Sequence, residues 1–90
     1  MPNYLITYDL RKVRNYQPLY DALAQWKAVR LLESVWLAEL QGPSATIRQI
    51  LATHIDKDDG IAIIELAGQF DWATLRVPVA ASNWLKARSP

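Results

Sequence analysis

The sequence has no cysteine and a single histidine, and these two scarcities exclude several kinds of site. Without cysteine the chain can form no disulfide scaffold, no thiolate zinc site and no cysteine nucleophile. One histidine excludes a metal site built from several histidines of one chain. The three glycines are well separated, so the sequence contains no glycine-rich phosphate loop.

Long apolar runs are also missing. No stretch approaches the roughly 20 apolar residues that a membrane-spanning helix requires. The N-terminus lacks a basic segment followed by an apolar one, which predicts that there is no signal peptide. We therefore expect a soluble, cytoplasmic protein that does not associate with a membrane.

The chain has 90 residues, of which 51% are hydrophobic and 21% are charged, and this predicts one domain over residues 1–90. Folding of a chain of this size hides roughly 64% of its surface. The net charge of +1 is unevenly spread, with +3 in residues 1–30, −3 in 31–60 and +1 in 61–90. This split could attract phosphate at one end of the molecule, and an ordinary mixed surface is the alternative.

The first thirty residues predict a strand followed by a helix. Residues 4–8 are β-branched and aromatic, which favours a strand ending near Asp9. Asn15 can cap a helix over residues 16–27, and Pro18 lies in its first turn. Apolar residues recur in that helix at a spacing of three to four, so one of its faces is apolar.

The middle of the chain predicts two further strands and a second helix. Residues 29–40 are mostly apolar, and we interpret them as two strands joined by a tight hairpin near 33–34. A single bent strand is the alternative. Ser44 is expected to cap the second helix. The apolar face of this helix consists of Ile47, Ile50, Leu51 and Ile55.

The last third predicts a strand and a C-terminal extension. An acidic turn at residues 56–60 leads into a strand at 61–66 that is apolar on both faces. We expect a short added strand at 73–77. Pro78 then opens a short helix over residues 79–87, which packs through Trp84 and Leu85.

This order of elements predicts an α+β fold, the ferredoxin-like βαββαβ plait. We expect a four-stranded antiparallel sheet with two helices on one face, a core over about residues 3–66 and an extension over 67–90. Two helices cover one face only, yet the strands carry apolar residues on both faces. We therefore predict a homodimer in which a second copy covers the other face.

Asp9 is the acid that most resembles a metal ligand, because it follows an apolar strand and precedes a basic loop. Two copies of Asp9 near a two-fold axis would disfavour joint ionisation unless a cation lay between them. Mg²⁺ prefers few carboxylates together with water and substrate phosphate, so a paired site could hold it. The alternative is that Asp9 caps the loop or pairs with Arg11 or Lys12.

Arg11, Lys12 and Arg14 form the densest basic cluster in the sequence. Beside tyrosines such a cluster could hold the phosphates of a nucleic acid, and a solvated loop is the alternative. The acids at residues 56–59 do not form a calcium loop, because the twelfth position of an EF-hand would be Ala67.

Three segments, taken in order along the chain, form a pattern that can be compared with known families. Residues 4–10 read Tyr-Leu-Ile-Thr-Tyr-Asp-Leu, residues 34–37 read Ser-Val-Trp-Leu, and residues 56–64 are an acidic turn before an apolar strand. Over most of residues 3–66 this succession resembles the family of the small CRISPR-adaptation subunit, the second Cas protein. The resemblance implies a ferredoxin-like homodimer with opposed sheet faces.

The same resemblance implies that Asp9 matches the metal-binding, catalytic aspartate of a magnesium-dependent endonuclease acting on RNA or DNA. A scaffolding role with the CRISPR integrase, without catalysis, is the alternative that it also implies. The virulence-associated protein D group shares the fold and is linked to toxin–antitoxin ribonucleases. It implies a third alternative, a regulatory module with a protein partner.

Overall fold

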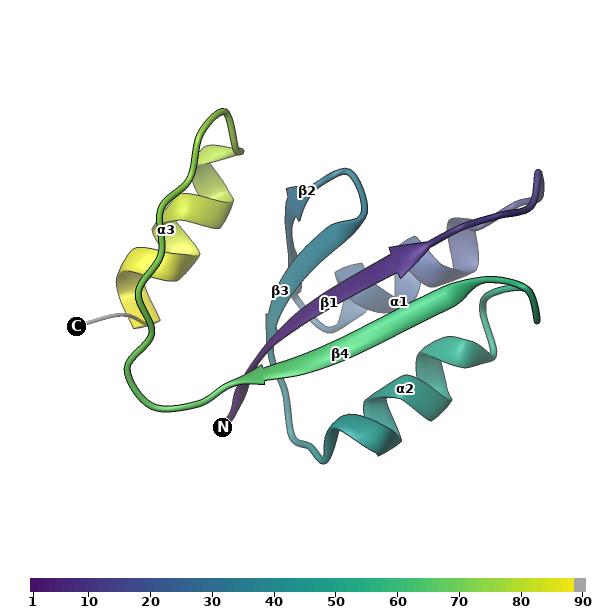
Figure 1. Ribbon diagram of the computed structural model, residues 1–90, viewed down its shortest axis with the longest axis horizontal. Coiled ribbons are helices and arrows are strands. Elements are labelled where there is room, and N and C mark those ends of the chain that lie inside the picture. Colours follow the sequence, from purple (N-terminus) through teal and green to yellow (C-terminus); the bar gives the residue numbers. More distant parts are fainter. Residues whose placement is uncertain (89–90) are drawn as a thin grey trace.

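The computed structural model describes residues 1–88, which form four strands and three helices (Figure 1). Their order is the one that the sequence predicts, followed by the C-terminal helix. The elements are β1 (Asn3–Asp9), α1 (Gln17–Gln25), β2 (Val29–Leu32), β3 (Val35–Glu39), α2 (Ser44–Ala52), β4 (Gly60–Leu66) and α3 (Val79–Arg88).

The four strands form one antiparallel sheet in the order β2-β3-β1-β4. This arrangement confirms the predicted α+β class and is consistent with a ferredoxin-like plait. The hairpin near residues 33–34 is also confirmed, because β2 and β3 are separate strands with Arg30 opposite Trp36. A register shift follows at the hairpin, where Leu32 lies opposite Val35.

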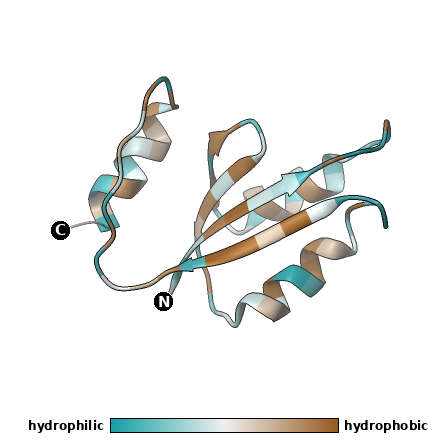
Figure 2. Cartoon of the chain, viewed as in Figure 1, coloured by the Kyte–Doolittle hydropathy of each residue, from teal (hydrophilic) through white to brown (hydrophobic). Residues whose placement is uncertain are grey.

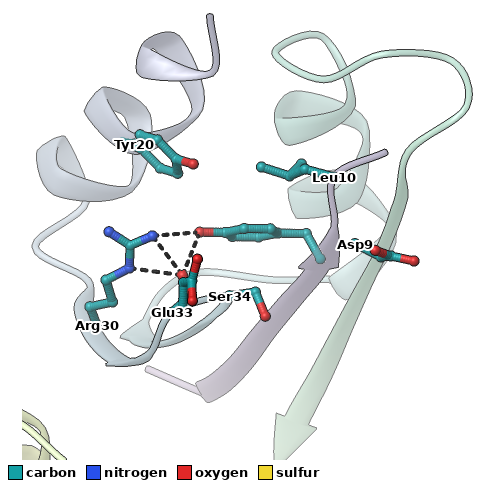
Figure 3. A pocket seen from close by; sticks show the side chains of 7 residues that line it. Asp9, Leu10, Tyr20, Arg30, Glu33 and Ser34 are labelled. Carbon is teal, nitrogen blue, oxygen red and sulfur yellow. Dashed lines mark hydrogen bonds between the residues drawn. The ribbon is translucent and has the colours of Figure 1, made fainter. Parts of the chain in front are cut away.

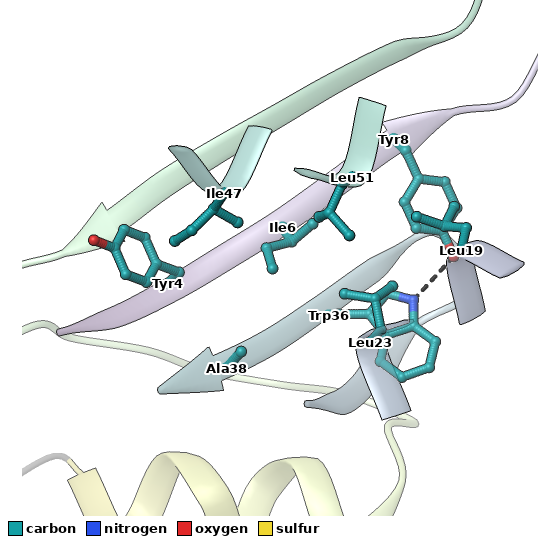
Figure 4. Close-up of a cluster of buried hydrophobic side chains, with 9 residues drawn as sticks. All are labelled: Tyr4, Ile6, Tyr8, Leu19, Leu23, Trp36, Ala38, Ile47 and Leu51. Carbon is teal, nitrogen blue, oxygen red and sulfur yellow. Dashed lines mark hydrogen bonds between the residues drawn. The ribbon is translucent and has the colours of Figure 1, made fainter. Parts of the chain in front are cut away.

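Helices α1 and α2 cover one face of the sheet, and the main core lies between this face and the two helices (Figure 4). Strand alternation places Tyr4, Ile6 and Tyr8 of β1 on this face. Each of these side chains is at most 6% exposed. The remaining buried members of the cluster are Leu19 and Leu23 of α1, Trp36 and Ala38 of β3, and Ile47 and Leu51 of α2.

The two predicted helices lie on one face, and the opposite face is partly covered by helix α3 of the C-terminal extension. Helix α3 contacts β2, and Trp84 and Leu85 form a second buried cluster with Leu37 of β3. The prediction that the C-terminal helix packs through these two residues is therefore confirmed. In Figure 1, α3 lies on the β2 and β3 side of the sheet, away from β4.

The short strand expected at residues 73–77 is wrong. In the structure this segment is an irregular connection that leads from β4 to α3. Arg76 has a φ of 58°, in the left-handed region, which interrupts an extended run. The connection leaves the edge of the sheet instead of pairing with β4, and β4 stays an edge strand.

Helix boundaries differ from the predictions by a few residues. Asn15 is not the cap of α1, because Tyr16 occupies that position and no side chain caps the helix. Asn15 precedes it and accepts a hydrogen bond from the backbone N–H of Gln17 at 2.9 Å, and Pro18 lies in the first turn. Ser44 is not the cap of α2, because Pro43 occupies that position in an extended conformation and Ser44 is the first helical residue. Ile50 is 44% exposed, so it does not belong to the buried face of α2.

Candidate nucleic-acid interface at the end of β1

Asp9 is the last residue of β1, and its carboxylate is exposed to solvent. The alternation of the strand places it on the same face as Leu5 and Thr7, opposite to the face that holds Tyr8. Its Oδ2 atom lies 3.1 Å from Nε of Arg11 and accepts a hydrogen bond from it. The structure therefore contains the ion pair that the sequence offered as the alternative to a metal ligand.

The basic loop, residues 10–15, lies against the acidic turn, residues 56–59. Nζ of Lys12 is 3.0 Å from Oδ2 of Asp58, and Nη1 of Arg14 is 3.9 Å from Oδ2 of Asp56. Every member of the predicted phosphate-binding cluster thus has an acidic partner. Because opposite charges at this distance cancel much of each other's field, the loop attracts anions less than its composition indicates.

Arg11 makes two further hydrogen bonds besides that to Asp9. Its Nη1 atom donates a hydrogen bond to the carbonyl of Asp58 at 2.8 Å, and its backbone N–H donates to Oδ1 of Asp59 at 2.7 Å. The guanidinium lies over Gly60, where an added Cβ would be 3.2 Å from Nη2. Glycine at residue 60 therefore leaves room for the guanidinium to lie close to the backbone of β4.

Asp59 organises the acidic turn. Its carboxylate accepts hydrogen bonds from the hydroxyl of Tyr16 at 2.7 Å and from the backbone N–H of Asp56 at 2.7 Å, in addition to Arg11. Desolvation raises the pKa of Asp59, but these hydrogen bonds to its charged form outweigh that effect, and the net pKa is lowered. The pKa of Tyr16 is raised, first by desolvation and then by its bond to Asp59.

A pocket of about 260 Å³ opens beside Tyr8, on the face of the sheet that α1 covers (Figure 3). Figure 3 shows the Arg30 guanidinium at one side of it and the Tyr20 ring above, with Leu10 across the opening. The lining residues are Tyr8, Asp9, Leu10, Tyr20, Arg30, Glu33 and Ser34.

Arg30 is fixed in this pocket by neutral groups. Its Nε and Nη2 atoms donate to the backbone carbonyl of Glu33 at 2.9 and 2.6 Å, and Nη2 also donates to the Tyr8 hydroxyl at 3.4 Å. Its guanidinium lies 5.1 Å from the centre of the Tyr20 ring and 5.2 Å from that of Trp36. Within residues 1–88, no carboxylate forms an ion pair with it.

The Tyr8 hydroxyl links these groups. It accepts a hydrogen bond from the indole N–H of Trp36 at 2.9 Å and donates one to the carbonyl of Glu33 at 3.3 Å. The pocket wall is thus a network in which the hydrogen-bonding groups of Tyr8 and Trp36 are satisfied. The sequence did not single out Arg30, which lies in the mostly apolar stretch at residues 29–40. The cross-strand position opposite Trp36 is the signal that could have identified it.

Part of the second sheet face remains open over β1 and β4. The cross-strand pairs Leu5–Ile64 and Thr7–Ala62 lie on this face, and we call these four residues the open patch. Ile64 is 53% exposed. Figure 2 shows hydrophobic residues along β4, which carries half of the patch. A hollow of about 250 Å³ that includes Asp9 and Gly60 continues the patch to the end of the strands.

The residues of one chain do not fit a magnesium site. Asp9 supplies a single carboxylate, and the Arg11 guanidinium already contacts one of its oxygens. Among residues 1–88, no group of three histidine, cysteine, aspartate or glutamate side chains is arranged to hold a metal ion. Magnesium at Asp9 therefore stays a prediction that requires the second carboxylate of a dimer.

The chain matches no family model. Its fold is similar to the crystal structure of a hypothetical protein, TT1823, from Thermus thermophilus, with a TM-score of 0.67. The two sequences are 21% identical, and the match covers 87% of this chain and 95% of the other. This likeness concerns the fold alone. In the part of the chain that the structure describes, no helix has the length and apolar character needed to cross a membrane.

Proposed function

We propose that the protein is a homodimeric nucleic-acid-binding module in which Arg30, at the end of the sheet, is the principal phosphate contact. The observation that carries this proposal is that, among the described residues, the positive charge of Arg30 has no acidic partner. Its partners are a backbone carbonyl, a tyrosine hydroxyl and two aromatic rings, none of which neutralises it. The basic loop, by contrast, is paired with the acidic turn.

A guanidinium held in this way suits a phosphate. Its planar fork matches two phosphate oxygens, and a side chain that is already fixed loses little conformational freedom on binding. Nη1 of Arg30 has no hydrogen bond among the described residues, whereas Nε and Nη2 are engaged, so the N–H groups of Nη1 are the ones left for a phosphate oxygen. Tyr20 at the mouth of the pocket offers an aromatic face on which a base could stack.

The dimer part of the proposal is supported by the open patch. An exposed isoleucine on the edge strand of a sheet face, beside a half that α3 already covers, is the kind of surface that a second copy can bury. A stable interface of standard size buries about 800 Å² per partner. Two-fold symmetry would present two copies of Arg30 to one nucleic acid.

The test is a salt titration of binding to labelled RNA and duplex DNA, with Arg30→Gln compared with wild type. We expect the substitution to weaken binding roughly tenfold, because a charge-assisted contact is lost. The slope of log affinity against log salt should fall by about two, one unit for each Arg30 of the dimer. Arg14→Gln removes one positive charge from the paired loop and is the matched control, for which we expect little change.

Two outcomes would contradict this proposal. Equal binding by wild type and Arg30→Gln, with both folded by circular dichroism, would remove Arg30 as the contact. Absence of binding by the wild type would remove nucleic acid and favour a protein partner. Arg30→Lys keeps the charge without the fork, so partial recovery by this variant would attribute the rest of the loss to geometry.

A second candidate is the magnesium-dependent endonuclease that acts through paired Asp9 carboxylates. The observation in its favour is that Asp9 shares its face with the open patch, so a dimer through this patch would draw the two carboxylates toward one interface. Cleavage of RNA or duplex DNA with Mg²⁺, lost in Asp9→Asn while the dimer persists, would establish it. Full cleavage by Asp9→Asn would remove Asp9 from the chemistry.

A further inference from the structure

The guanidinium of Arg11 occupies the position beside the Asp9 carboxylate that a bound metal cation would occupy. It contacts Oδ2 of Asp9 at 3.1 Å, and it is fixed from the other side by the carbonyl of Asp58 at 2.8 Å. The backbone N–H of the same residue is anchored on Asp59. Most surface ion pairs join two mobile side chains, but the guanidinium of this one also donates a hydrogen bond through Nη1 to a backbone carbonyl.

The backbone of β4 shapes the place that this guanidinium occupies. Asp9 lies opposite Gly60 across the β1–β4 pair. A Cβ at residue 60 would be 3.2 Å from Nη2 and 3.8 Å from Cζ of Arg11, and 3.9 Å from Cβ of Asp9. A side chain at this position would crowd the guanidinium, which would have to shift to keep its contact with the carboxylate. Three separate features therefore bring Arg11 to Asp9: the glycine, the Asp58 carbonyl and the Asp59 carboxylate.

A divalent cation and this guanidinium compete for the same carboxylate. A metal ion that binds Asp9 must displace Arg11 from Oδ2 or accept a positive charge a few ångströms away, which opposes its binding. Magnesium also needs several oxygen ligands in octahedral geometry. One carboxylate that is already paired with a guanidinium is a poor basis for an Mg²⁺ site.

We infer that Arg11 is a built-in cation that takes the place of a metal ion at Asp9, so that this end of the protein operates without divalent metal. The arrangement of Arg11 over Gly60 keeps Mg²⁺ and similar ions from Asp9. Removing or displacing the guanidinium should open Asp9 to them. This inference does not require that the protein bind nucleic acid, and it argues against the metal-dependent candidate.

The experiment measures Mn²⁺ affinity by electron paramagnetic resonance on the full chain, with Mn²⁺ as a spectroscopic probe for Mg²⁺. Arg11→Gln removes the guanidinium, and Gly60→Ala crowds it while both charged residues remain. We expect Arg11→Gln to bind Mn²⁺ roughly tenfold more tightly than wild type, because the competing positive charge has left Asp9, and Gly60→Ala to show a smaller gain in the same direction. Lys12→Gln is the control, since it removes a neighbouring positive charge that is paired with Asp58 instead.

The added variant Arg11→Gln with Asp9→Asn should return the Mn²⁺ affinity to the wild-type level, which would assign the gain to Asp9. An equal gain in Lys12→Gln would show that net charge alone is responsible and would overturn the inference. Tight Mn²⁺ binding by the wild type, unchanged in Arg11→Gln, would overturn it as well. Gly60→Ala retains Arg11, so the inference stays testable if Arg11→Gln does not fold.

Discussion

Arg11 and Arg30 are the same side chain in two different electrostatic settings at one end of the sheet. Arg11 contacts the Asp9 carboxylate, whereas Arg30 contacts neutral acceptors and aromatic rings. The charge of the first is largely cancelled, and the charge of the second remains available to a ligand. The difference comes from the neighbours that the fold supplies, and sequence position alone does not reveal it.

The partners of the basic loop illustrate why the site could be predicted only in part. Pairing of Asp9 with Arg11 was one of two alternatives, because the residues are close in sequence. The contact of Arg11 with Asp59 joins residues 48 positions apart. It exists because the register of the sheet places Asp9 opposite Gly60, and one sequence does not encode that register visibly.

The pH dependence of stability provides a test at the scale of one residue, Asp59. Its pKa is lowered in the folded protein, so it contributes stability that is present above its unfolded pKa of about 3.9 and is lost as pH falls through the lower folded pKa. We expect Asp59→Asn to lower the free energy of unfolding at neutral pH. The difference from wild type should shrink as the pH falls below about 4.

Urea unfolding followed by tryptophan fluorescence between neutral and acidic pH measures this difference. Tyr16→Phe removes one of the donors that lower the pKa of Asp59, and we expect it to reduce the pH-dependent part without abolishing it. A difference between wild type and Asp59→Asn that stays constant over the whole range would show that the carboxylate is not stabilised in its charged form.

At the scale of elements, the predictions were confirmed where apolar residues face one core. The helix at residues 17–25 shows a helical period, whereas the strand at 60–66 was predicted from a nearly continuous apolar run, and one core covers the inner face of each. The connection between β4 and α3 was misread. Its apolar residues resemble a strand, but Arg76 has a left-handed backbone conformation that no local pattern announced.

Helix α3 covers part of the sheet face for which the sequence predicted a second copy of the chain. The surplus of apolar strand residues predicted a covering partner, and α3 supplies part of that cover through Trp84 and Leu85. The cluster that α3 forms with Leu37 of β3 extends to Leu5 of β1 and Leu66 of β4. Within the open patch, the exposed residues are therefore Ala62 and Ile64 of β4. The argument for a second copy therefore applies to half of the face instead of all of it.

At the scale of the whole molecule, the two faces of the sheet offer a matched pair of exposed isoleucines. Ile64 is 53% exposed in the open patch, and Ile50 is 44% exposed on α2, which covers the other face. If the dimer forms through the open patch, Ile64→Lys should disrupt it. Two-fold symmetry would bring a lysine from each copy into the same apolar interface. Ile50→Lys changes the same residue type at similar exposure and should leave the dimer intact.

Sedimentation equilibrium at micromolar concentration measures the expected states. We expect the wild type and Ile50→Lys to sediment at about twice the chain mass of 10.2 kDa, and Ile64→Lys to sediment near that mass itself. The reason is that burying an unpaired ammonium against an apolar partner surface costs more than one contact in the patch supplies. A wild type that sediments as a monomer would contradict the dimer altogether. Disruption by Ile50→Lys instead of Ile64→Lys would move the interface to the helical face, and Arg30 would then lie on the side that the second copy covers.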